Sequence, residues 1–173
     1  MALLRHLAEE RHRSLNGGRA AVATAPWNAW KDVSAMSLPR GRTSAPEVSA
    51  SVAAFLTEPL TATLTTLRPD GSPHVAPVRF TWDAASGLAR VMTVVTSRKA
   101  RNVLANPGGR AVLCQVEGFS WVTLEGTGRV SDDPARVAEG VRRYAKRYWS
   151  APPNPPGRVV LEIAVDRVMT LNT

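Results

Sequence analysis

The chain has 173 residues, a length that favours one domain with a substantial core. Its 22 Lys and Arg outnumber its 14 Asp and Glu, and the formal net charge of +8 favours anionic partners such as phosphate-bearing cofactors. No dense basic block or nucleic-acid-binding motif occurs, no apolar run approaches the roughly 18 residues of a membrane span, and the single Cys114 excludes an internal disulfide. The N-terminus lacks the apolar core of a secretory signal, so we expect a cytoplasmic protein that binds neither nucleic acid nor membranes.

Residues 1–45 differ in composition from the rest of the chain. They are rich in Gly, Pro, Ser and Ala and show no sustained period. We expect residues 1–45 to be a disordered N-terminal extension and residues 46–173 to be the folded domain. Translation starting at Met36 is the alternative, and the intact mass of the native protein would decide between them.

From residue 46 the pattern predicts short, regularly spaced elements. Three consecutive strands joined by tight turns favour an antiparallel barrel over a parallel sheet, so we expect a mainly β fold of six strands with flanking helices. Glycines inside the fifth strand, at 126 and 128, suggest a bend or a close backbone approach. The expected helices cover 46–58, 98–105 and 134–149, and the expected strands cover 60–68, 73–83, 88–96, 109–117, 119–131 and 158–168.

The motifs of the common self-sufficient active sites are missing. The chain has no Gly-rich dinucleotide fingerprint, Walker loop, CxxC or HExxH. His74 is the single histidine after residue 45, which argues against a metal site or a catalytic triad, and we interpret it as a core or rim residue rather than a proton donor. Any catalysis would therefore depend on a cofactor for the reactive atom.

The short helix after Ser97 carries its cations where they are least expected. Ser97 is a good N-cap, yet basic residues crowd the first turn, where backbone N–H groups already give a partial positive charge. These residues could be a solvated face, or they could form an anion site together with Thr96, Ser97 and the free N–H groups. Helical spacing places Ala100, Val103 and Leu104 against the barrel, and the opposite face holds Arg98, Arg101, Asn102 and Ala105.

Three segments, in this order and spacing, resemble the split β-barrel flavin and deazaflavin oxidoreductases, the superfamily of the pyridoxamine 5'-phosphate oxidases. The segments are LTTLRPDGSPHVAPVRFTWD, TSRKARNVLANPGGRAVL and FSWVTLEGTGRV. The resemblance covers about residues 47–170. It implies an FMN-binding split barrel that acts as a homodimer, with cofactor sites in grooves between the two barrels.

Two further features resemble the branch that uses coenzyme F420. Lys99-Ala100-Arg101-Asn102 is similar to the K-x-x-N element that holds the cofactor phosphate in that branch. The segment RYAKRYWSAPPNPPGRVVLEI is similar to the C-terminal part of F420-dependent biliverdin reductases. The resemblance therefore implies F420 as cofactor, with FMN as the alternative, and a small conjugated molecule as substrate.

The resemblance also implies roles for individual residues. The phosphate-bearing tail would meet the side chains near the 98–105 helix, and the strand 76–79 would run beside the deazaflavin ring. Trp121 would lie near the ring, or else be a core residue. Carboxylates of the substrate would meet Arg79, Arg147 or Arg158. The residues implied to bind the cofactor are Ala76, Pro77, Val78, Thr93, Thr96, Ser97, Lys99, Asn102 and Trp121.

The activity implied is transfer of a hydride from reduced F420 to a conjugated electrophile, with biliverdin as the leading substrate. No side chain stands out as the proton donor. The alternatives are an FMN-dependent oxidoreductase of the same fold and a non-catalytic protein that binds F420, flavin or haem.

Overall fold

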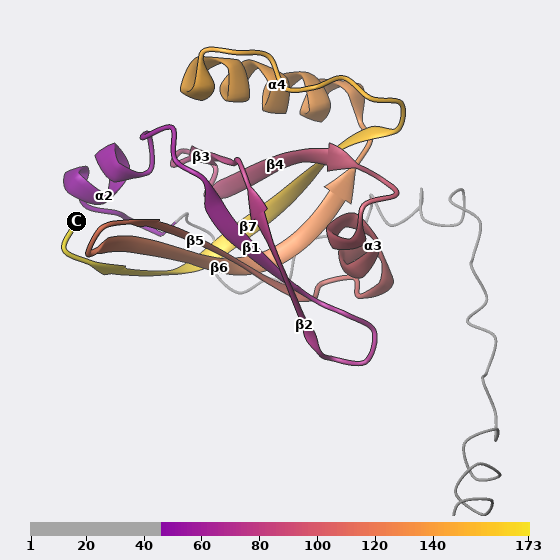
Figure 1. Ribbon diagram of the computed structural model, residues 1–173, viewed down its shortest axis with the longest axis horizontal. Coiled ribbons are helices and arrows are strands. Elements are labelled where there is room, and N and C mark those ends of the chain that lie inside the picture. The colour runs from indigo at the N-terminus through magenta and orange to yellow at the C-terminus, as the bar shows by residue number, and fades with distance from the viewer. Residues whose placement is uncertain (1–45) are drawn as a thin grey trace, which may run out of the picture. The chain divides into compact units, whose positions relative to one another are not determined.

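The computed structural model describes residues 46–173, and the predictions for residues 1–45 lie outside this part of the chain (Figure 1). Three helices and seven strands form, in chain order, α2 (Ala50–Phe55), β1 (Ala62–Leu67), β2 (Pro73–Val78), β3 (Thr81–Asp83), β4 (Leu88–Val94), α3 (Arg98–Ala105), β5 (Arg110–Glu117), β6 (Ser120–Ser131), α4 (Pro134–Tyr148) and β7 (Arg158–Leu171).

The strands form one antiparallel sheet in the order β2-β1-β5-β6-β7-β4-β3. The predicted mainly β fold with flanking helices is confirmed, with seven strands in place of six. No helix among the described residues is long and apolar enough to cross a membrane.

The extra strand arises because the segment predicted as one strand over 73–83 divides into β2 and β3. Phe80, at the division, does not pair with a neighbouring strand through its backbone. Instead its N–H donates to Tyr148 Oη at 3.1 Å, and its carbonyl accepts from Arg147 Nη1 at 2.7 Å. Two side chains of α4 thus satisfy the backbone at this corner, which alternation along the strand could not reveal.

The division also rolls the sheet into a barrel. β2 and β3 lie at opposite edges of the strand order, but only Arg79 and Phe80 separate them along the chain. The two edges must therefore approach one another. β3 pairs with β4 only as far as Arg90, so the outer edge of β4 from Val91 to Val94 has no strand partner in the described part of the chain. This stretch and the outer edge of β2 form the split in the barrel.

Alternating apolar side chains fill the barrel interior. The core includes Phe80, Leu64, Leu113, Leu124 and Ile163, all almost fully buried. The predicted close approach at the glycines of β6 is confirmed at residue 126. A β-bulge separates Glu125 from Gly126, and a Cβ at Gly126 would lie 2.1 Å from the carbonyl oxygen of Ala164.

The helices begin at the caps that the sequence offers. Ser97 is the N-cap of α3, where its hydroxyl accepts from the Ala100 N–H, and Asp133 caps α4 in the same way. α4 lies along β3, β4 and β7, and α3 and α2 lie near opposite ends of the barrel (Figure 1). α3 and α4 therefore stand on either side of the split.

Candidate functional site

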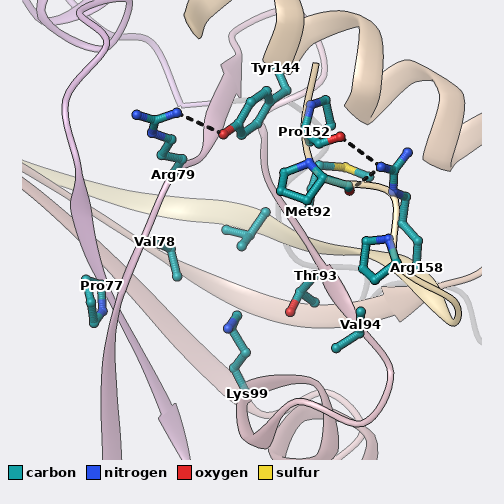
Figure 2. Close-up of a pocket in the computed structure, with 13 residues that line it drawn as sticks. Pro77, Val78, Arg79, Met92, Thr93, Val94, Lys99, Tyr144, Pro152 and Arg158 are labelled. Carbon is teal, nitrogen blue, oxygen red and sulfur yellow. Dashed lines mark hydrogen bonds between the residues drawn. The ribbon is translucent and has the colours of Figure 1, made fainter. Parts of the chain in front are cut away.

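A pocket of about 360 Å³ opens at the split between β2 and β4 (Figure 2). This volume lies in the range of about 300–1,000 Å³ typical of small-molecule sites. Its walls come from the end of β2, the unpaired part of β4, α3, α4 and the loop before β7. The lining residues are Pro77, Val78, Arg79, Val91, Met92, Thr93, Val94, Lys99, Tyr144, Pro152, Pro153, Pro155 and Arg158.

The pocket is cationic and has no acidic lining. Arg79, Lys99 and Arg158 line it, and no Asp or Glu does. None of these three side chains forms an ion pair with another residue in the described range 46–173. Their uncompensated charge makes the pocket suitable for an anionic ligand.

Lys99 enters the pocket from the first turn of α3. Figure 2 shows its side chain directed toward the centre of the pocket, below Thr93. The Thr93 hydroxyl donates to Ser97 Oγ at 3.1 Å, which ties β4 to the N-cap of the helix. The cation and the start of the helix thus act together at this end of the pocket, the arrangement typical of phosphate sites.

The positive charge near Lys99 also affects His74 on the neighbouring strand β2. Burial and the positive charges of Arg68, Lys99 and Arg98 hold the pKa of His74 below its ordinary value. His74 is half-buried on the strand next to the pocket, which agrees with its interpretation as a rim residue. The Nδ1 atom of His74 is buried without a hydrogen-bond partner in the described part of the chain.

Arg79 occupies the opposite end, next to two tyrosines of α4. Its Nη1 donates to Tyr144 Oη at 3.2 Å, and its guanidinium lies 5.0 Å from the centre of the Tyr148 ring. The two tyrosine rings lie 4.7 Å apart. The hydrogen bond with Tyr144 raises the pKa of Arg79 above its ordinary value, so this end of the pocket keeps a fixed positive charge.

Arg158 braces the proline-rich loop that forms the third wall. Its Nη2 donates to the carbonyls of Pro152 and Pro153, the first of these at 2.9 Å (Figure 2). The Gly157 carbonyl accepts from the Val95 N–H, which fixes the end of the loop to the end of β4. The prolines provide a rigid, apolar wall that lacks backbone donors.

The structure brings five of the predicted ligand residues together in the pocket: Pro77, Val78, Arg79, Thr93 and Lys99. Arg158, the further candidate for a substrate carboxylate, lines it as well. Ala76, Thr96 and Ser97 are adjacent in sequence to lining residues but do not line the pocket themselves.

Asn102 faces the barrel, not the outer side of α3 where helical spacing placed it. It is 2% exposed, and its Nδ2 donates to Thr66 Oγ1 at 3.0 Å. The predicted face was wrong because α3 is short and is covered on more than one side, so that Asn102 is buried together with Ala100 and Val103. Its amide fastens α3 to β1, on the side away from the pocket lining.

Arg147 also lies outside the pocket. It is 8% exposed and donates to the Glu58 carbonyl, to the Phe80 carbonyl and to Gln115 Oε1. Its guanidinium lies 4.4 Å from the centre of the Phe80 ring. With every donating nitrogen committed to the protein, Arg147 holds the β2–β3 corner and has no group left for a substrate.

Trp121 is half-buried on the outer face of the sheet. The register pairs it with Val116 of β5 and Leu171 of β7, and the next residue, Val122, points into the core. It therefore belongs to neither the barrel core nor the pocket of this chain.

Sequence reasoning missed the contributions of Met92, Tyr144 and the prolines of the 150–157 loop. The helical spacing of Tyr144 along α4 is typical of a core residue, and Tyr144 is indeed 8% exposed, yet its hydroxyl reaches Arg79. The proline run lies within the segment that resembles the F420-dependent biliverdin reductases, but no role in the site was predicted for it. Arg158, which follows the run after Gly157, was a further signal that could have linked it to the site.

Residues 48–172 match the family model of pyridoxamine 5'-phosphate oxidase. The chain belongs to this family. A relative from Mycobacterium tuberculosis (strain CDC 1551 / Oshkosh), an F420H(2)-dependent biliverdin reductase, is 48% identical over 116 residues, which cover 67% of this chain and 82% of the relative.

Solved structures of similar proteins have the same fold. The conserved hypothetical protein Rv2991 from Mycobacterium tuberculosis superposes with a TM-score of 0.61 at 22% identity, covering 76% of this chain and 88% of the other. An F420 reductase superposes with a TM-score of 0.56 at 26% identity, covering 72% of this chain and 98% of the other. The family's split barrel is thus the fold of residues 46–173.

Proposed function

We propose that this member of the pyridoxamine 5'-phosphate oxidase family is an F420-dependent reductase that transfers a hydride to a conjugated electrophile, with biliverdin as substrate. The observation that carries this proposal is the pocket at the split, with three uncompensated cations and no acid in its lining. The 48% identity to an F420H(2)-dependent biliverdin reductase supports the same cofactor and substrate.

The residues of the pocket fit F420. A flat ring can lie in the slot between the outer edges of β2 and β4, where backbone groups lack strand partners. Lys99, beside the N-terminus of α3, would hold the phosphate-bearing tail, with Thr93 and Ser97 next to it. When bound in its reduced form, F420 supplies the hydride.

The chain's own residues would bind and orient the substrate. Biliverdin has two propionate groups, and Arg79 and Arg158 are the two lining cations that remain once Lys99 binds the phosphate. Val78, Val91 and the prolines make the walls apolar and exclude water from the conjugated system. Holding the reacting atoms at close range in this way provides much of the rate enhancement in cofactor-dependent enzymes.

We expect the protein to be a homodimer, because the outer face of the sheet carries an uncharged and partly apolar surface. A row of uncharged residues crosses five strands there: Pro77, Thr63, Cys114, Thr123 and Met169. Exposed apolar side chains, among them Val75, Val116 and Leu171, flank this row. An exposed apolar face of this kind is typical of a subunit interface. Because Pro77 also lines the pocket, a second copy on this face would border the site.

Met169→Arg tests the interface. The 40%-exposed Met169 lies on this face near the C-terminal end of β7, so a charge there should convert the dimer to monomers in sedimentation velocity. Trp149→Arg is the matched control, because Trp149 is exposed at the end of α4 and away from this face. A wild-type protein that sediments as a monomer would contradict the expected homodimer.

The activity is tested by mixing the protein anaerobically with reduced F420 and biliverdin. The expected result is oxidation of F420 with equal formation of bilirubin, well above the rate without protein. Binding of F420 without such oxidation would contradict a biliverdin reductase and favour a binding protein. Parallel titrations with F420 and FMN decide the cofactor, and tighter binding of FMN would favour the FMN-dependent alternative.

A further inference from the structure

Tyr144 and Tyr148 lie one turn apart on α4, but their hydroxyl groups are used differently. Tyr148 Oη accepts from the Phe80 N–H and donates to a backbone carbonyl of Phe80 or Leu60. Tyr144 Oη accepts from Arg79 at 3.2 Å, and its own hydrogen has no acceptor among residues 46–173. The Tyr144 hydroxyl is therefore a free donor at the wall of the pocket.

Arg79 donates to the oxygen that would carry the negative charge after loss of that hydrogen. A guanidinium that donates to a phenol oxygen stabilises the phenolate through its charge and its hydrogen bond. Arg79 cannot itself be the acid, because the hydrogen bond with Tyr144 raises its pKa above an already high ordinary value. The pair thus combines a neutral acid with a fixed cation that supports the conjugate base.

The other polar groups of the pocket are less suited to this role. The Thr93 hydroxyl already donates to Ser97, and an aliphatic alcohol is a far weaker acid than a phenol. Arg158 donates to the proline carbonyls and, as a guanidinium, does not release a proton at physiological pH. Lys99 stands at the opposite end of the pocket, beside the cap of α3 (Figure 2).

We propose that Tyr144 is the catalytic proton donor, an inference that rests on the proposed function. A hydride adds with its electron pair to a carbon of the conjugated substrate, and the displaced electron pair moves to a ring nitrogen. That nitrogen takes the proton of Tyr144: the N–H bond forms as the O–H bond breaks. The phenolate beside Arg79 then regains a proton from water, which reaches it along the exposed side of Arg79. Hydride and proton together account for the two-electron reduction.

The test compares wild type with Tyr144→Phe, which keeps the ring against Tyr148 and removes only the hydroxyl. Single-turnover oxidation of reduced F420 by biliverdin should slow by about 100-fold, the lower range for general acid catalysis. F420 and biliverdin should each bind within about twofold of wild type.

A second measurement needs no F420. The absorption band of biliverdin bound to the protein alone should shift in Tyr144→Phe, since the bound pigment loses a hydrogen bond. Tyr148→Phe is the control, because it should lower the melting temperature but keep the wild-type band and the wild-type rate.

The outcomes separate this inference from the proposed function. If wild type does not oxidise reduced F420 with biliverdin, the proposed function fails and this inference fails with it. If wild type is active and Tyr144→Phe matches its single-turnover rate, or loses affinity alone, Tyr144 is not the proton donor and the proposed function stands.

Discussion

Arginines gather on two sides of α4, and their partners differ completely. On the side of β3, β4 and β7 they surround the buried carboxylates of Asp83 and Glu162, where Arg90 lies 3.1 Å from each. On the side of the split, Arg79 meets a phenol and Arg158 meets backbone carbonyls, with no carboxylate in the lining. Each arginine of the first group is compensated by a carboxylate with which it pairs, and neither arginine of the second group is.

The difference shows that a structural arginine cluster is distinguished from an anion-binding site by whether carboxylates compensate the arginines, and not by the number of cations. The charge of a guanidinium that lies between buried carboxylates is balanced within the fold. Removal of one partner of a buried ion pair leaves the other charge buried and unpaired. A guanidinium held by neutral groups keeps its charge for a ligand when it lines a pocket. Arg147 is an exception, because its partners are also neutral but it is buried in the core and does not line the pocket.

Acidification should have the largest effect, and it should act on the compensated cluster. Burial would raise the pKa of Glu162, but the Arg129 hydrogen bond and the charges of its arginines outweigh burial and hold the pKa below its ordinary value. Hydrogen bonds from Arg142 and Arg143 lower the pKa of Glu139 to about 2. Between the ordinary and the lowered pKa the unfolded chain binds more protons, so stability present at neutral pH is lost as the pH falls.

The free energy of unfolding, measured by urea titration, should therefore decrease continuously from about pH 5 to pH 2. The decrease should be smaller in Glu162→Gln, which lacks one of the titrating groups. A wild-type protein equally stable at pH 6 and pH 3 would show that these ion pairs do not contribute.

Glu162→Gln at neutral pH should have the next largest effect. Glu162 is 2% exposed and accepts from Arg90, Arg129 and Arg136, so the amide would leave the buried Arg90 with one carboxylate instead of two and the other two arginines with none. We expect a loss of about 3–5 kcal/mol in the free energy of unfolding. Glu139→Gln, which breaks the partly exposed pairs with Arg142 and Arg143 within α4, is the control and should cost much less. Equal stability of the two variants would refute the distinction between the two regions.

Arg147→Met should cost about 2–4 kcal/mol, because it leaves the buried Gln115 Oε1 without its donor and removes the hydrogen bonds to the Phe80 and Glu58 carbonyls. The measurement is again urea unfolding, with Lys146→Met, a change at the exposed neighbouring position, as control. If Arg147 instead bound the substrate, its substitution would weaken biliverdin binding and leave stability unchanged.

The sequence predicted the fold because its signals are local. Alternation along the strands, the N-cap at Ser97 and the glycines of β6 each depend on residues a few positions apart, and the structure confirms them. The K-x-x-N resemblance directed attention to Lys99, which lines the pocket, and to Asn102, which does not.

The site was harder to predict because its decisive contacts join distant segments. The Arg147 guanidinium meets backbone groups 67 and 89 residues earlier in the chain, and Asn102 meets a hydroxyl 36 residues away. Residue type predicts that such residues are polar, and helical spacing predicts which side of the helix they occupy. They do not say whether a neighbouring strand supplies the partner, and so they could not separate Arg147 from Arg79.

The central claim is that the uncompensated pocket binds F420 through Lys99, and a fluorescence titration of F420 tests it most directly. Lys99→Ala should weaken binding at least tenfold, about 1.4 kcal/mol, as expected for loss of a charged hydrogen bond. Arg101→Ala, which removes an exposed cation of the same helix outside the pocket lining, should bind within about twofold of wild type. If Lys99→Ala binds F420 as tightly as wild type, or if Arg101→Ala weakens it equally, general charge rather than this pocket would account for binding.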